Sequence, residues 1–208
     1  MSHFESFGVW ISDYASKVLV PAVKTRVSPP KSLGMKVFQA YMEIHTSCER
    51  LRQITRCASQ RLPASLNVSK SDYLRFQIES YFQEIYILKM SIEAFLNLLE
   101  KQPILRRHKV IKELRGVLCT STKSIIRLRG QHVHETRFDD QEITELGALE
   151  LIASLGKNRQ AMRLLKLRYP AVQKKWREQL KKRNDAINSL LDHVFKKCRP
   201  LAEGVVSD

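Results

Sequence analysis

Ser69 to Lys101 reads SKSDYLRFQIESYFQEIYILKMSIEAFLNLLEK and is the most apolar long stretch of the chain. Ser69 and Asp72 stand at its start with the spacing of a helix N-terminal capping box. Behind them, apolar side chains recur every three or four residues, which is the period of an α-helix. The stretch therefore predicts a central helix, with a core-facing stripe of Tyr73, Phe76, Ser80, Ile87, Met90, Ala94 and Leu98, widened by Phe82, Ile85, Tyr86 and Phe95.

The same helical period recurs on both sides of this stretch, and alternating strand patterns are scarce. Asp139 and Glu142 predict the cap of one further helix, and Gly156 predicts its end. Prolines and Gly130 are expected to break the pattern elsewhere. The predicted helices cover about 4–20, 35–60, 69–101, 104–128, 140–155 and 171–200. This pattern predicts an all-α fold, an antiparallel helical bundle with one core.

The expected organisation is one domain with extensions, for which 208 residues are sufficient. Residues 1–30 are expected to form an N-terminal helix and a linker that packs on the bundle. The bundle domain itself is expected to cover residues 31–200, with Pro200 ending its last helix. Residues 201–208 are expected to form a frayed tail.

The chain is strongly basic, with 36 Lys and Arg against 21 Asp and Glu and a formal net charge of +15. This surplus favours a polyanionic partner, RNA or DNA above all. Lys174, Lys175 and Arg177 belong to a basic last helix whose apolar stripe is intact, so they are expected on its opposite face. That face is either a track for RNA phosphates or an ordinary solvated surface.

The four cysteines, Cys48, Cys57, Cys119 and Cys198, are widely spaced and form no C-x-x-C pair. Such spacing is typical of reduced cysteines, and it favours neither a disulfide framework nor a zinc site. No apolar run approaches the length needed to cross a bilayer, and Glu5 and Asp13 do not suit a secretion signal. We therefore expect a cytoplasmic protein without a membrane partner.

Residues Leu128 to Glu135 read LRGQHVHE and are followed by TRFDD, at the junction of two predicted helices. An Arg and a His at this spacing can act on a phosphodiester without a metal, because Arg stabilises the transition-state charge and His transfers the proton. Metal binding through His132 and His134 is not expected, because side chains two apart on a helix diverge and no further ligand stands at a known spacing. We expect no cofactor.

The segment Leu128–Glu135, followed by Arg137-Phe138-Asp139-Asp140, resembles the R-x4–6-H motif of the HEPN superfamily of helical proteins. The resemblance covers roughly residues 70–160 and implies a metal-independent endoribonuclease that acts as a homodimer. It implies Arg129 as the phosphate-binding residue and His134 as the general acid/base, with attack by the ribose 2′-OH. Further RNA contacts are expected from Arg127, Gln131, His132, Arg137, Lys174, Lys175 and Arg177. A role as a toxin or in defence is in keeping with the family, which also admits an antitoxin partner.

An alternative function is a non-catalytic helical module that holds nucleic acid or an acidic protein on its basic face. Gly130 favours this alternative, because family members usually carry Asn, Asp or His directly after the Arg. A structural role for Arg129 and His134 is a further alternative, in which they cap carbonyls and pair with Glu135 or Asp139. The clustering of Arg127, Arg129, His132 and His134 favours the enzyme.

Overall fold

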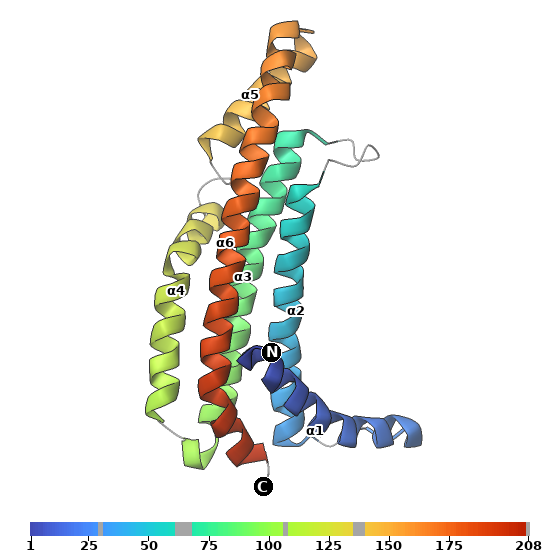
Figure 1. The fold of residues 1–208 in the computed structure, drawn as a ribbon, viewed down its shortest axis with the longest axis vertical. Coiled ribbons are helices and arrows are strands. Elements are labelled where there is room, and N and C mark those ends of the chain that lie inside the picture. The colour runs from blue at the N-terminus through green and yellow to red at the C-terminus, as the bar shows by residue number, and fades with distance from the viewer. Residues whose placement is uncertain (29–30, 61–67, 106–107, 135–139, 207–208) are drawn as a thin grey trace. The chain divides into compact units, whose positions relative to one another are not determined.

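In the described residues the protein is almost entirely α-helical (Figure 1). The computed structural model describes residues 1–28, 31–60, 68–105, 108–134 and 140–206, and the side chains of these residues except 124–134. Over these residues it has no strand, and the predicted all-α class is confirmed. The helices are α1 (His3–Thr25), α2 (Leu33–Ser59), α3 (Lys70–Glu100), α4 (Lys109–His134), α5 (Gln141–Leu155) and α6 (Arg159–Val206), and a short 3-10 helix, η1 (Pro103–Leu105), precedes α4.

Two compact units share the long helices. Unit 1 comprises Met1–Cys48, Ile87–Lys123 and Ala186–Asp208, and unit 2 comprises Glu49–Tyr86 and Ser124–Asp185. The boundaries between the two units fall within α2, α3, α4 and α6. The domain boundaries expected from the sequence, at residues 30 and 200, lie instead at prolines.

Aromatic rings fill the core of unit 1. Phe7 of α1 lies 5.8 Å from Phe95 of α3 and 4.8 Å from Phe195 of α6, measured between ring centroids. Phe4 of α1 and Tyr41 of α2 lie 5.0 and 5.8 Å from Phe195. The start of α1 is therefore part of this core, because large rings gain most from leaving water and from edge and tilted contacts with one another.

A partly buried polar network joins three helices of unit 2. Tyr81 Oη of α3 donates to Asn184 Oδ1 of α6 at 2.8 Å, and Asn184 Nδ2 donates to Thr55 Oγ1 of α2 at 3.0 Å. Gln173, earlier on α6, donates to the carbonyl oxygen of Ala58, later on α2, at 3.0 Å. Because residue numbers rise along one helix as they fall along the other, α2 and α6 run antiparallel in this unit.

The buried face of α3 differs from the predicted stripe. Phe76 and Met90 are 62% and 44% exposed, so the prediction that their stripe faces the core is wrong. Several apolar stripes on this helix satisfy the helical period, so only the neighbouring helices decide which one faces the core. The buried apolar residues of α3 are Leu74, Ile78, Tyr81, Phe82, Ile85, Leu88, Ile92, Phe95, Leu96 and Leu99, which confirms Phe82, Ile85 and Phe95.

Three predicted helix ends at prolines are wrong. Helix α1 continues through Pro21 to Thr25, and α6 continues through Pro170 and Pro200 to Val206. A proline removes one helical hydrogen bond and costs about 3 kcal/mol in a helix interior, which packing on both sides can offset. Tyr169 is buried directly before Pro170, and Ala202 is buried shortly after Pro200. The last residues to Val206 are therefore packed helix and not a frayed tail.

Side-chain caps mark the other boundaries. Ser69 Oγ accepts from the Asp72 backbone N–H at 3.0 Å, which fixes the predicted start of α3. The cap of α5 is Asp140, whose Oδ1 accepts from the Ile143 N–H at 3.1 Å, and not the predicted Asp139, which lies outside the described residues. Gly156 follows α5 as predicted. Over the described residues, none of the helices has the length and apolar character needed to cross a membrane.

Candidate nucleic-acid interface

The Arg–His segment, which begins at Leu128, reaches the end of α4 at His134. Helical backbone continues through Leu128 and Gly130 to His134, so the predicted helix end at Leu128 and the break at Gly130 are wrong. A glycine in a helix interior costs only about 1 kcal/mol, which does not suffice to end a long helix. Arg129 and His134, five residues apart, lie about 140° apart around the axis of a regular helix. Contact of both with one phosphate therefore requires a second chain or a local bend.

The side chains of residues 124–134, and residues 135–139 altogether, lie outside the described part of the chain. The catalytic candidates Arg129 and His134 and the RNA-contacting candidates Arg127, Gln131, His132 and Arg137 belong to these ranges. Their roles stay predictions.

A row of exposed cations follows one face of α6 within unit 2. Successive members are 4, 3, 8, 3 and 4 residues apart, which keeps them within about 80° of arc around a regular helix axis. The buried side chains of the same segment, from Ala161 to Leu180, occupy a different side of the helix. This row, the cationic stripe, consists of Arg159, Arg163, Lys166, Lys174, Arg177 and Lys181.

The cationic stripe carries positive charge that the fold leaves available. Over the described residues, none of its six members forms an ion pair with a carboxylate. From Arg159 to Lys181 the stripe extends about 33 Å at 1.5 Å per residue. Such a row of exposed charges attracts a polyanion along its whole length.

Two other cations of α6 are engaged with α5. Lys175 Nζ lies 2.5 Å from Glu142 Oε2, and Arg168 Nη1 lies 2.5 Å from Glu145 Oε2. The hydrogen bond that Lys175 Nζ donates to the Glu142 carboxylate raises the pKa of Lys175, since it favours the charged form. Of the three predicted RNA contacts on this helix, Lys174 and Arg177 therefore lie on the cationic stripe, whereas Lys175 lies at the contact with α5.

Three members of the stripe, Arg159, Arg163 and Lys166, did not stand out in the sequence. Their spacing of four and three residues is helical and is visible in the sequence. Their relation to Lys174 is not evident from the sequence, because Tyr169-Pro170 predicts an interruption of the helix between them and Lys174. Once α6 is continuous through Pro170, the two halves of the stripe share one face.

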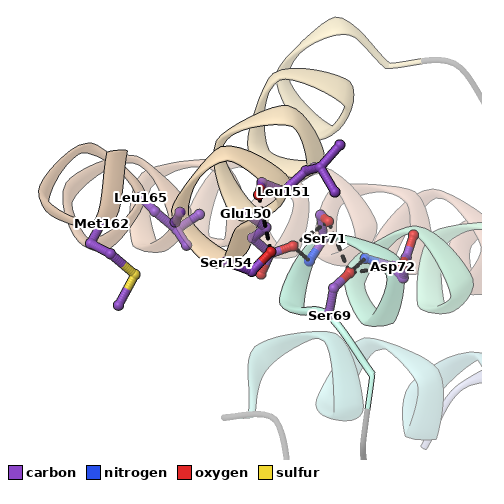
Figure 2. Close-up of a pocket in the computed structure, with 10 residues that line it drawn as sticks. Ser69, Ser71, Asp72, Glu150, Leu151, Ser154, Met162 and Leu165 are labelled. Atoms are coloured by element: carbon purple, nitrogen blue, oxygen red, sulfur yellow. Dashed lines mark hydrogen bonds between the residues drawn. The ribbon is translucent and has the colours of Figure 1, made fainter. Parts of the chain in front are cut away.

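A pocket of about 660 Å³ lies where α5 meets the starts of α3 and α6 (Figure 2). The Glu150 carboxylate beside it accepts hydrogen bonds from the backbone N–H groups of Lys70 and Ser71 and from Ser71 Oγ, at 2.8, 3.1 and 2.5 Å. Glu150 thus satisfies free donors at the start of α3 and attaches α5 to it. No Lys or Arg lines this pocket, so we interpret its polar groups as structural. The lining consists of Ser69, Ser71, Asp72, Gly147, Glu150, Leu151, Ala153, Ser154, Met162 and Leu165.

A second pocket, of about 460 Å³, lies at the turn between α5 and α6. This hairpin pocket is lined by Lys157, Arg159, Arg163 and Lys166 together with Ala153 and Met162. Arg159, Arg163 and Lys166 are also the first three members of the cationic stripe. The hairpin pocket is therefore the place where the stripe begins.

The described residues contain no group of three or more His, Cys, Asp and Glu side chains arranged to hold a metal ion. Comparisons of the chain with models of protein families, with curated proteins and with solved structures give no match.

Proposed function

We propose that the protein binds RNA along the cationic stripe of α6. The observation that carries the proposal is a row of six exposed cations on one face of α6, without carboxylate partners among the described residues. A nucleic-acid strand presents phosphates at about 3.4 Å intervals when its bases are stacked, so about 33 Å of stripe corresponds to roughly ten nucleotides. The net charge of +15 adds a favourable long-range field around this contact.

A labelled single-stranded RNA of twelve nucleotides tests the proposal by fluorescence anisotropy. The parent protein is expected to bind it at low salt, and the double variant Arg163→Gln/Arg177→Gln is expected to bind it more weakly. The matched control is Lys36→Gln/Lys112→Gln, which removes two exposed charges from unit 1 and is expected to bind as the parent does. Absence of binding at low salt contradicts the proposal. Binding of an acidic peptide in its place would favour a protein partner.

RNA cleavage is the second candidate function. Arg129 and His134 stand at the end of α4, in the same compact unit as the cationic stripe. The resemblance to the HEPN superfamily implies that the ribose 2′-OH attacks the adjacent phosphorus, while the bond from phosphorus to the 5′-oxygen of the next nucleotide breaks. The products are a cyclic phosphate and a 5′-hydroxyl. His134 would transfer the protons and Arg129 would stabilise the charge on the phosphate oxygens. Arg129 and His134 of one helix lie too far apart around its axis to contact one phosphate together. In a homodimer, the second chain can supply one of the two residues.

Incubation of RNA with the purified protein in excess EDTA tests the cleavage. The parent is expected to cut the RNA to products with a cyclic phosphate, and His134→Ala is expected to lose at least 10²-fold in rate, as for removal of a placed acid/base group. His132→Ala is the matched control and is expected to lose less. Light scattering on the same samples tests the dimer. If both variants cut as fast as the parent, the Arg–His segment is not the catalytic site.

A further inference from the structure

The cationic stripe begins at a pocket and not on a flat surface. Its first three members line the hairpin pocket, and Lys157 adds a further cation from the turn before α6. A strand that follows the stripe toward the start of α6 therefore reaches an open pocket lined by four exposed cations. The remaining stripe members, Lys174, Arg177 and Lys181, are farther along the helix and do not line this pocket.

The charge of the hairpin pocket comes from side chains, and over the described residues its four cations form no ion pair with a carboxylate. None of its lining residues is acidic, and the sequence from Lys157 to Arg177 contains no Asp or Glu. Asn158 Oδ1 already accepts from the backbone N–H groups of Gln160 and Ala161, at 2.9 and 3.1 Å, so these groups of the helix start are occupied. The volume of about 460 Å³ lies in the range of small-ligand sites, about 300–1,000 Å³.

We propose that the hairpin pocket binds a phosphomonoester, namely the terminal phosphate of an RNA strand that lies along the cationic stripe. A phosphomonoester carries about −1.5 to −2 charges at pH 7, whereas each internal phosphodiester carries one. The higher charge of a phosphomonoester suits a pocket lined by four cations, namely Lys157, Arg159, Arg163 and Lys166. Ala153 and Met162 add an apolar part to the lining, where the sugar and base of the last nucleotide can pack. This inference rests on the proposed binding of RNA.

The same hairpin also exposes apolar side chains, with Leu155 and Leu167 exposed by 79% and 74%. Cations beside exposed leucines are also the chemistry with which proteins attach to anionic lipid surfaces. Continuity between the pocket and the stripe favours RNA, because a row of charges on one helix face leads into the pocket. The experiment includes a lipid arm for this reason.

The test compares two RNAs of one sequence, each of twelve nucleotides with a 3′ fluorescent label, which end in a 5′-phosphate or a 5′-hydroxyl. The parent is expected to bind the 5′-phosphorylated RNA roughly tenfold more tightly, as for one additional charge-assisted contact. Lys157→Gln, which alters the pocket and not the stripe, is expected to bring this ratio close to one. Arg177→Gln, which alters the stripe and not the pocket, is expected to weaken both RNAs and keep the ratio. Lys36→Gln is the control in unit 1.

The outcomes separate this inference from the proposed function. Equal affinity of the parent for both RNAs overturns the phosphomonoester site while RNA binding stands. If neither RNA binds, calorimetry with adenosine 5′-monophosphate decides: binding that Lys157→Gln abolishes keeps the site for free phosphomonoesters, and absence of binding overturns it. Capture by vesicles of phosphatidylcholine and phosphatidylserine that Leu155→Ser abolishes, without a preference for 5′-phosphate, assigns the hairpin to lipid and also overturns the inference.

Discussion

Lys175 of α6 and Glu142 of α5 form an ion pair, with Nζ and Oε2 2.5 Å apart. Arg168 and Glu145 form a second pair between the same helices. Residue numbers rise along α6 as they fall along α5, so the two pairs hold the helices as an antiparallel hairpin. On one side of α6, Arg168 and Lys175 thus bind carboxylates of α5. On the side with Lys174, the cations are exposed to solvent. Adjacent residues in the sequence therefore have different roles.

Separate replacement of stripe cations and of Lys175 tests this division of roles. Lys174→Gln/Arg177→Gln is expected to weaken binding of single-stranded RNA about tenfold at low salt, because it removes two phosphate contacts. Lys175→Gln is expected to weaken it less than twofold, because the amino group is engaged by Glu142. Anisotropy titrations of both variants beside the parent measure the difference. An equal loss in the two variants would show that the Lys175–Glu142 pair opens when RNA binds.

RNA affinity is expected to fall steeply with salt. Six stripe cations, each of which neutralises one phosphate of a single strand, give a slope of log affinity against log salt of about −4. The double variant Lys174→Gln/Arg177→Gln is expected to have a slope less steep by about one, since it releases fewer counterions. Titrations at four salt concentrations yield both slopes. Identical slopes for parent and variant would place the RNA elsewhere on the protein.

The polar network of unit 2 is expected to stabilise the fold. Tyr81→Phe removes the hydroxyl that donates to Asn184 Oδ1 at 2.8 Å, in a region where Tyr81 is fully buried. The expected loss is about 1–2 kcal/mol of unfolding free energy, because an acceptor is left without its donor. Tyr14→Phe is the control, since its hydroxyl has a longer contact with Ser32, 3.3 Å, in a partly buried place. Urea unfolding measures both variants, and equal losses would contradict the role of the network.

Cys198 is expected to make the protein less stable at alkaline pH. Burial raises the pKa of its thiol from 9.0 to about 12. Between these values the unfolded chain releases the thiol proton and the folded protein keeps it, so the unfolding free energy falls as pH rises above 9.0. Below pH 9.0 the contribution to stability is complete.

Urea unfolding of the parent and of Cys198→Ala between pH 8 and pH 10 measures this effect. The variant is expected to be less stable at pH 8, because it leaves a small cavity, but to lose less stability over this interval. The interval ends at pH 10 because burial also raises the pKa of Tyr41 and Tyr169 from 10.0 to about 12. A parallel decline of parent and variant would mean that another group controls the alkaline loss.

For the candidate interface, the sequence determined that the last helix is basic and that Lys174 and Arg177 lie on it. It did not determine that Lys175 is paired, because its partner Glu142 is on another helix and only packing brings the two together. It also did not connect Arg163 with Arg177, since a local rule for Pro170 predicts a break that tertiary contacts override. The hairpin pocket exists only after α5 and α6 fold back on each other.

The sequence by itself determined the all-α class and the boundaries capped by Ser69 and Gly156, because helical period and capping are local properties of the chain. Only the tertiary structure decided which face of α3 is buried, since Leu74 and Phe76 are both apolar and a single helix has no preference between them. It also decided that Pro21, Pro170 and Pro200 lie within helices. Burial of apolar surface along a whole helix outweighs the loss of one hydrogen bond at a proline.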